Sequence, residues 1–97
     1  MNNPAVSVVV PTYNAGGELN SAIQSVLDQT YEHIDEIIVV DDCSEKPAIE
    51  ILDQENELIT VVRHDENRNG AAARNTGIRR ASGDLIAFLD DDDNWKL

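Results

Sequence analysis

The chain has 97 residues, which is enough for one small domain with a modest hydrophobic core but not for two. Its 19 acidic and 7 basic residues give a formal net charge of -12, which argues against nucleic acid or an anionic membrane surface as a direct partner. The single cysteine, Cys43, permits no internal disulfide, and no apolar run reaches membrane-spanning length. We therefore expect a soluble cytoplasmic domain, whose longer parent protein could still act at the inner face of a membrane.

The chain opens with a predicted strand followed by a predicted helix. Residues 6–10 (VSVVV) are β-branched and almost uniformly apolar, which is typical of a strand buried on both faces. The segment 11–14 (PTYN) is expected to stop this strand. From Glu18 onward, apolar residues recur at helical spacing and predict one apolar stripe: Leu19, Ala22, Ile23, Val26 and Leu27.

The second predicted strand follows a connector over residues 31–35 and ends at a pair of carboxylates, Asp41 and Asp42. The later elements follow in order: a short helix over 48–55, a strand over 58–62, a polar loop over 64–70, a helix over 71–81 and a strand over 85–89. Strand and helix thus alternate in the order β-α-β-α-β-α-β without a tight hairpin. This order predicts an α/β fold with a Rossmann-like parallel sheet and helices on both of its faces.

Polar segments follow three of these strands: residues 11–14, the pair Asp41 and Asp42, and the run of four aspartates over 90–93. In parallel sheets, ligands bind outside the carboxyl ends of the strands, so we expect the three segments to form one crevice. Adjacent carboxylates repel one another, and the aspartate run therefore predicts a bound cation or ligand, with Asp91 the most exposed of the four. A solvated charge run, and a loop cap in the case of the Asp41–Asp42 pair, are the structural alternatives.

Four segments in order resemble the nucleotide-sugar-binding half of the family 2 glycosyltransferases, which are inverting enzymes of GT-A fold: 8–14 (VVVPTYN), 36–42 (EIIVVDD), 67–77 (NRNGAAARNTG) and 87–93 (AFLDDDD). The likeness covers nearly the whole chain. The last segment is similar to that family's Asp-x-Asp metal motif. The resemblance therefore implies a domain, over residues 1–97, that binds a nucleotide-diphosphate sugar.

The resemblance also implies roles for individual residues. It places Pro11, Thr12, Tyr13, Asp41, Asp42, Arg74 and Asp90 in nucleotide binding, and Asp92 and Asp93 in binding Mn²⁺ or Mg²⁺. A hard cation with oxygen ligands would let a diphosphate approach this acidic pocket. The alternatives are a simple strand-ending turn for Thr12 and Tyr13, and a surface ion pair for Arg74. His33 and His64 receive no role.

Two positions depart from the family pattern, in which glycine is common at the places of Cys43 and Asn69. A β-carbon at Cys43 puts the geometry of that loop in doubt if the turn needs a positive φ, whereas Asn69 is expected to be the milder change. The family's general base lies well beyond the Asp-x-Asp motif, so we assign no catalytic base and expect it downstream of Leu97. The chain is accordingly expected to be the donor-binding part of a longer enzyme and inactive alone.

The resemblance further implies a saccharide or lipid-linked acceptor and a UDP-sugar as the favoured donor. Two other functions stay open: a non-catalytic nucleotide-sugar-binding module, and a Mg²⁺-binding receiver domain of signalling proteins. The receiver pattern fits less well because its acidic residues follow the first and third strands. We also expect the edge of the strand over 85–89 to be bare and to promote self-association.

Overall fold

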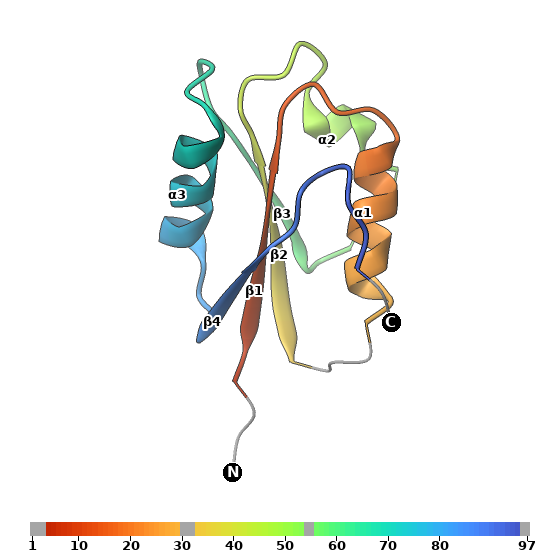
Figure 1. The fold of residues 1–97 in the computed structure, drawn as a ribbon, viewed down its shortest axis with the longest axis vertical. Coiled ribbons are helices and arrows are strands. Elements are labelled where there is room, and N and C mark those ends of the chain that lie inside the picture. The colour runs from red at the N-terminus through yellow and green to blue at the C-terminus, as the bar shows by residue number, and fades with distance from the viewer. Residues whose placement is uncertain (1–3, 30–32, 54–55, 96–97) are drawn as a thin grey trace.

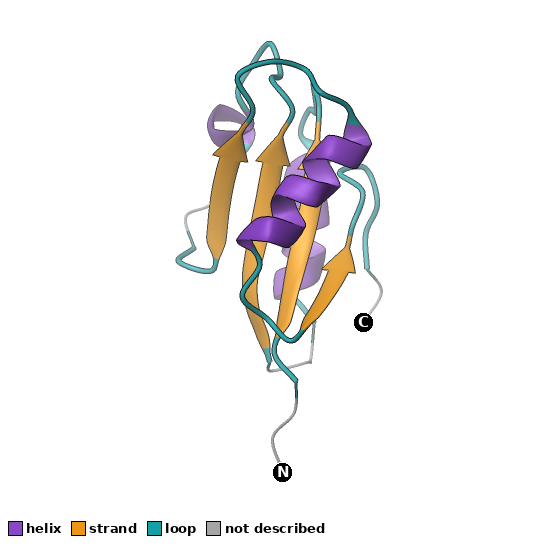
Figure 2. Ribbon diagram, turned by 90° about the vertical axis from the view of Figure 1, so that its left-hand side faces the viewer, coloured by secondary structure: helices purple, strands orange, loops and turns teal. Residues whose placement is uncertain are grey.

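The computed structural model describes residues 4–29, 33–53 and 56–95, which form one four-stranded sheet with helices against it (Figure 1). The elements are β1 (Val6–Thr12), α1 (Glu18–Leu27), β2 (Ile34–Asp41), α2 (Ala48–Ile51), β3 (Ile59–Arg63), α3 (Gly70–Arg80) and β4 (Leu85–Phe88). The strand order is β3-β2-β1-β4, and each neighbouring pair is parallel (Figure 2). The predicted α/β class and the order of its elements are confirmed.

The helices cover both faces of the sheet, with α3 on one side and α1 and α2 on the other (Figure 1). Successive side chains of a strand point to opposite faces, so Val8 and Val10 pack with α1 while Val9 packs with Ala73 of α3. This double coverage explains why residues 6–10 are apolar without alternation. Each face contributes a separate hydrophobic cluster, and together they fix the sheet between the helices.

The helix α3 lies close to β1 because Gly77 carries no side chain. A β-carbon added at Gly77 would lie 2.3 Å from Val9 Cγ1, well inside the contact distance of two carbon atoms. Gly77 is buried, and its backbone rests directly on the sheet. This close approach brings the N-terminal half of α3 toward the carboxyl ends of the strands.

The strand β1 extends through Pro11, although the sequence predicts that Pro11 stops it. Val9 O accepts a hydrogen bond from Leu89 N–H, and Thr12 O accepts one from Asp42 N–H. The backbone N–H and C=O groups of odd-numbered β1 residues therefore point toward β4, and those of even-numbered residues point toward β2. The missing N–H of Pro11 falls on the β4 side, where β4 has already ended at Phe88, so no ladder hydrogen bond is lost.

The helix α2 is shorter than predicted. The sequence indicates a helix over 48–55, but α2 ends at Ile51, and Leu52 adopts an extended conformation with φ -63° and ψ 125°. Residues 54–55 lie outside the described part. The weak apolar stripe gives this helix little to bury beyond Ala48, whereas extended Leu52 packs on the main core. Across the described segments, no helix combines the length and apolar character needed to cross a membrane.

The strand β4 lies at the edge of the sheet and is paired only with β1 among the described elements. Its side chains are largely exposed: 54% for Leu85, 37% for Ile86 and 44% for Phe88. The expectation of a buried strand is therefore wrong for these three residues, because β4 is the edge strand and the three side chains pack into neither hydrophobic cluster of the described residues. Only Leu89, just after the strand, is buried. The bare apolar edge expected from the sequence is present.

Candidate functional site

A pocket of about 220 Å³ lies at the carboxyl edge of the sheet, where segments distant in sequence meet. Its lining residues come from the end of β1, the residue after β2, the first turns of α3 and the turn after β4: Pro11, Thr12, Tyr13, Asp42, Gly70, Ala73, Arg74, Asp90, Asp91 and Asp92. The three polar segments expected to converge do so here. The structure adds the N-terminal part of α3 to them.

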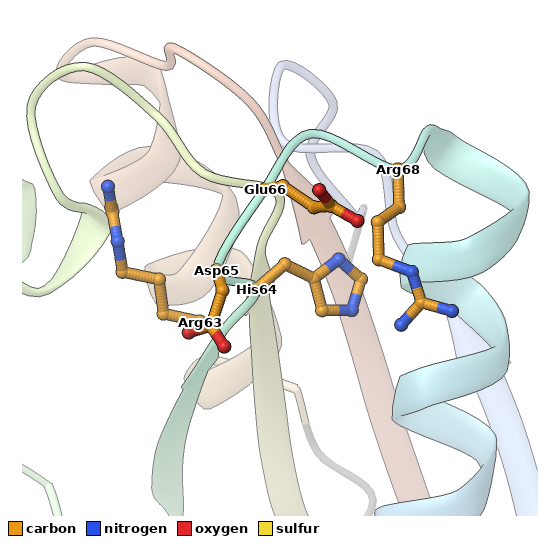
Figure 3. Close-up of a pocket in the computed structure, with 5 residues that line it drawn as sticks. All are labelled: Arg63, His64, Asp65, Glu66 and Arg68. Carbon is orange, nitrogen blue, oxygen red and sulfur yellow. The ribbon is translucent and has the colours of Figure 1, made fainter.

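A larger hollow, of about 600 Å³, lies beside this pocket and is lined by residues of the β3–α3 segment (Figure 3). Its lining residues are Arg63, His64, Asp65, Glu66 and Arg68. Figure 3 shows the His64 ring directed toward α3 and Arg63 directed to the opposite side. We regard the edge pocket as the functional site because four separate segments converge on it, whereas one segment lines the larger hollow.

Asp42 is buried at the base of the edge pocket, and its carboxylate is held by the loop that leads into α3. Its Oδ1 accepts hydrogen bonds from Arg68 N–H at 2.9 Å and from His64 Nδ1 at 2.8 Å, and its Oδ2 accepts one from Asn69 N–H at 2.9 Å. Burial by itself would raise the pKa of Asp42. The hydrogen bonds from His64 and the two backbone amides outweigh burial and hold the pKa below its usual value. Asp42 is therefore a fixed, ionised acceptor.

His64 is a site residue that the sequence left without a role. It is 7% exposed, and its Nε2 lies 2.7 Å from Thr76 Oγ1 on α3. The sheet register pairs Asp41 with Arg63, the last residues of β2 and β3. The residues that follow them, Asp42 and His64, are therefore neighbours at the carboxyl edge. Recognising His64 from sequence would have required this pairing of β2 with β3.

Asp41 faces into the protein. Its side chain is 1% exposed and accepts hydrogen bonds from Ser44 N–H at 2.9 Å and from Ala48 N–H at 2.8 Å, while Arg63 forms an ion pair with it at 2.8 Å. Burial would raise the pKa of Asp41, but these hydrogen bonds and the Arg63 charge together lower it. Asp41 is absent from the pocket lining. The structure supports the alternative role, a cap that orders the loop before α2, over the implied contact with a base.

The aspartate run forms a tight turn after β4, in which Asp93 N–H donates to Asp90 O at 3.1 Å. Asp91 is the half-buried member and accepts a hydrogen bond from Thr12 Oγ1 at 2.8 Å, whereas the other three are exposed. The expectation that Asp91 is the most exposed is wrong, because the turn directs it toward the end of β1. This hydrogen bond joins the two strand ends on either side of the pocket.

Arg74 of α3 lies across the pocket from the aspartate turn. Its guanidinium is 3.7 Å from Asp90 Oδ1, and both side chains are substantially exposed, at 46% and 65%. Such an open pair contributes little to stability. Arg74 thus lines the pocket and also forms the surface ion pair that the sequence left as its alternative.

The predicted metal ligands are not assembled into a cage. Among the described residues, no group of three or more His, Cys, Asp or Glu side chains is arranged to hold a metal ion. Asp90 and Asp92 line the pocket, while Asp93 does not, and Asp93 Oδ1 accepts a hydrogen bond from Asn94 N–H. Carboxylate oxygens suit Mg²⁺ or Mn²⁺, and Mg²⁺ is commonly held by one or two carboxylates together with substrate phosphates. The donor set fits a cation that arrives with a diphosphate.

Three non-glycine residues in the loops around the site have positive φ angles: Asn14 (53°), Cys43 (65°) and Asn69 (113°). The doubt about Cys43 was justified, since its φ lies in the left-handed region. The expectation that Asn69 is the milder change is wrong: φ 113° and ψ 170° lie outside the left-handed region that asparagine tolerates, in a region populated almost only by glycine. Asn69 N–H bonds to Asp42, and Asn69 Oδ1 caps α3 through Ala72 N–H, which together hold this conformation.

Comparison with known proteins assigns the family. A family model described as Glycosyl transferase family 2 matches residues 7–96, nearly the whole chain. The chain belongs to glycosyl transferase family 2. This membership confirms the resemblance seen in the sequence motifs, and it replaces the receiver-domain alternative.

Individual relatives of this family 2 chain agree with the assignment. It is 47% identical over 96 residues to TuaG of Bacillus subtilis (strain 168), which is named as a candidate teichuronic acid biosynthesis glycosyltransferase. The match covers 96% of this chain and 38% of TuaG. The fold matches S. aureus TarS 1-349 in complex with UDP-GlcNAc, with a TM-score of 0.82 and 32% identity over 93% of the chain and 27% of TarS. It also matches the mannosyltransferase PcManGT from Pyrobaculum calidifontis in complex with GDP-Man and Mn²⁺, with a TM-score of 0.84 and 28% identity over 99% of the chain and 30% of PcManGT.

The chain spans between a quarter and two fifths of the length of these relatives. The structural neighbours are GT-A glycosyltransferases, which confirms the predicted fold type. The remaining part of each relative has no counterpart in these 97 residues.

Proposed function

We propose that the chain binds the nucleoside diphosphate of a nucleotide-diphosphate sugar, with a UDP-sugar favoured, as the donor-binding part of a glycosyltransferase. One observation carries the proposal: an acidic and basic pocket joins the ends of three strands and α3, at the edge of the sheet where α/β folds bind ligands. Family membership supports it, as do structural neighbours solved with UDP-GlcNAc and with GDP-Man.

The residues of the pocket divide into a base side and a phosphate side. Asp42 supplies a buried, ionised acceptor for an N–H group of the base, and Tyr13, which is 51% exposed, offers a flat wall beside it. Arg74 supplies positive charge for the diphosphate, and Asp90 and Asp92 supply oxygen ligands on the facing side. The proposed order along the pocket is therefore base, ribose and diphosphate, from Asp42 toward the aspartate turn.

We include a divalent cation, Mn²⁺ or Mg²⁺, in the proposal because a diphosphate would otherwise meet the carboxylates of the aspartate turn. Asp90 and Asp92 would hold it, and Asp93, which lies outside the pocket lining, would need the turn to rearrange before it could contribute. When bound, such a cation stabilises negative charge on the departing nucleoside diphosphate. A neighbour solved with GDP-Man and Mn²⁺ supports this choice of metal.

The binding proposal is tested by calorimetric titration of UDP and GDP into the chain, with and without Mn²⁺. We expect binding that depends on Mn²⁺, and we expect Asp92→Asn to weaken it at least about tenfold, since a carboxylate ligand of the cation is lost. Asp53→Asn is the matched control, because Asp53 is an exposed carboxylate that lines a different hollow with Asn20. Absence of binding of either nucleotide to a folded chain, with and without Mn²⁺, would overturn the proposal.

We further propose that transfer to an acceptor hydroxyl, on a saccharide or a lipid-linked saccharide and with inversion, needs a general base outside these 97 residues. The greater length of the relatives supports this division. The 97-residue chain should then bind UDP without transferring sugar. Measured transfer by this chain alone would contradict the division, and a full-length protein that binds but never transfers sugar would favour a non-catalytic binding module.

The apolar edge of β4 supports a separate proposal, that the isolated chain self-associates. Leu85, Ile86 and Phe88 expose apolar surface on a strand that pairs with no second strand of the described chain, which is the arrangement that favours strand pairing between molecules. Phe88→Lys should shift the sedimentation profile toward monomer. The control is Ile49→Lys, which changes an equally apolar residue, 62% exposed, on α2. A chain that stays monomeric at high concentration would contradict the proposal.

A further inference from the structure

His64 is a buried histidine whose two ring nitrogens both have partners. Nδ1 lies 2.8 Å from Asp42 Oδ1, and Nε2 lies 2.7 Å from Thr76 Oγ1. The ring therefore bridges the residue after β2 and the middle of α3, and Asp42 and α3 both contribute residues to the lining of the edge pocket. His64 itself is not among the residues that line this pocket.

The partners determine which nitrogen carries the proton. An ionised carboxylate can only accept hydrogen bonds, so Nδ1 must donate to Asp42. Nε2 can then accept from the Thr76 hydroxyl, whose oxygen in turn accepts from Arg79 at 3.4 Å. The contact with Asp42 requires a proton on Nδ1, and the two contacts together fix the orientation of the ring.

The same hydrogen bonds leave Asp42 with limited capacity for a ligand. Oδ1 already accepts from His64 and from Arg68 N–H, while Oδ2 accepts only from Asn69 N–H. Each carboxylate oxygen has two acceptor positions, so the remaining one is on Oδ2. A partial rotation of the carboxylate about its Cβ–Cγ bond would move this free position, and the hydrogen bond from His64 to Oδ1 opposes such a rotation.

We propose that His64 is a positioning residue for base recognition: it locks the Asp42 carboxylate so that one defined oxygen accepts an N–H of the base. Through Thr76, it also fixes this carboxylate relative to α3, the helix that carries Arg74 on the phosphate side. The inference rests on the proposed nucleotide binding. It predicts that His64 controls discrimination between bases, and not the affinity for the diphosphate.

Two amide substitutions separate the two contacts of the ring. The Nδ2 of asparagine lies where His64 Nδ1 lies, two bonds from Cβ, so His64→Asn keeps a donor for Asp42 and loses Thr76. The amide nitrogen of glutamine lies near the place of Nε2, so His64→Gln keeps the reach to Thr76 and loses the donor for Asp42. Both variants are of similar polarity, and both remove the imidazole.

The experiment measures Mn²⁺-dependent binding of three probes to the 97-residue chain and to both variants. The first probe is UDP or GDP, whichever binds more tightly to the unchanged chain; the second is CDP, and the third is inorganic pyrophosphate. Uracil and guanine present an N–H where cytosine presents an acceptor. We expect His64→Gln to reduce the ratio of the affinity for UDP or GDP to that for CDP by about tenfold, which is the cost of one charge-assisted hydrogen bond. The affinity for pyrophosphate should not change. His64→Asn should retain the preference within about threefold.

Equal preference in both variants, or a loss in His64→Asn that His64→Gln does not show, would overturn the proposal. So would a matching loss of pyrophosphate affinity, since that would indicate a purely structural role. If the His64 variants fail to fold by circular dichroism, Thr76→Val provides the second test, with an expected loss of about threefold in base preference and none in pyrophosphate binding. Failure of the unchanged chain to bind any nucleotide would instead refute the proposed function.

Discussion

Aspartate clusters follow both β2 and β4, but the two clusters differ in burial and in hydrogen bonding. Asp41 and Asp42, after β2, are at most 5% exposed and accept hydrogen bonds from backbone amides and from Arg63 or His64. Asp90, after β4, is 65% exposed and has one distant arginine at 3.7 Å. Chemically equal side chains are thus fixed hydrogen-bond acceptors at one strand end and mostly exposed carboxylates at the other.

Position in the sheet explains this difference. β2 is an interior strand, and the carboxylates at its end receive N–H donors from the loop that follows β2 and from the loop that follows its neighbour β3. β4 is an edge strand of the described sheet, and the aspartates after it have one hydrogen bond from Thr12 to Asp91 and one open ion pair between Arg74 and Asp90. A rigid carboxylate suits recognition of a base, whereas an exposed set suits a cation that arrives with its ligand.

The largest effect should come from removing a carboxylate at the β2 end. Asp41→Ala leaves Ser44 N–H, Ala48 N–H and Arg63 without their shared acceptor, and we expect a loss of about 3 kcal/mol in the free energy of unfolding. The matched control, Asp93→Ala, makes the same change on an exposed residue and should stay within about 0.5 kcal/mol. Urea unfolding of both variants measures the two losses in the free energy of unfolding. Equal losses would contradict the distinction between the two strand ends.

The next largest effect should be that of acid, which acts on two carboxylates at the carboxyl end of β2 and on Glu36 near its start, where Ser7 and Ser82 donate to the carboxylate. The folded-state pKa values of Asp41, Asp42 and Glu36 are lowered below their ordinary values of 3.8, 3.8 and 4.5, so the unfolded chain takes up protons first as the pH falls. Stability from these groups is complete near neutral pH. It is lost as the pH falls through the ordinary values toward the lower folded-state pKa values, at up to about 1.4 kcal/mol per pH unit for each group.

Urea unfolding between pH 8 and pH 3 tests this behaviour. We expect little change down to about pH 5 and a steep decrease below it. Removing Asp41 should make the decrease shallower by about one proton, while Asp93→Ala should leave its slope unchanged. A steep loss that is already complete by pH 6 would mean that other groups control acid stability.

The smallest effect concerns the backbone of the β2 end. Cys43 follows Asp42 with φ 65°, a conformation that costs a residue with a β-carbon about 1–2 kcal/mol. Cys43→Gly should therefore raise the free energy of unfolding by about 1 kcal/mol after the added flexibility of glycine is subtracted. Cys43→Ala is the control, because it removes the same sulfur without permitting positive φ. A glycine variant no more stable than the alanine variant would contradict the expected strain.

Much of the fold follows from local patterns that the sequence displays directly. Residues 6–10 and 37–40 are apolar on both faces because helices cover both faces of the sheet, and α1 follows from its apolar stripe. The alternation of strands and helices then gives the parallel order and the edge at which ligands bind. Errors occur where the outcome depends on a neighbour: Pro11 continues β1 because β4 has ended, and α2 stops early because Leu52 packs better when extended.

The sequence by itself determined the fold class, the sheet edge at which the site lies and the family motifs that family membership confirms. Only the tertiary structure decided how the aspartates divide, with Asp41 inward, Asp42 fixed at the pocket, Asp91 held by Thr12 and His64 joined to Asp42. The physical reason is that a carboxylate's role depends on which donors surround it. The donors of Asp42 and Asp91 come from the β3–α3 segment and from β1, far away in sequence, and packing rather than any local pattern sets their positions. Asp41 combines two nearby amide donors with Arg63 of β3.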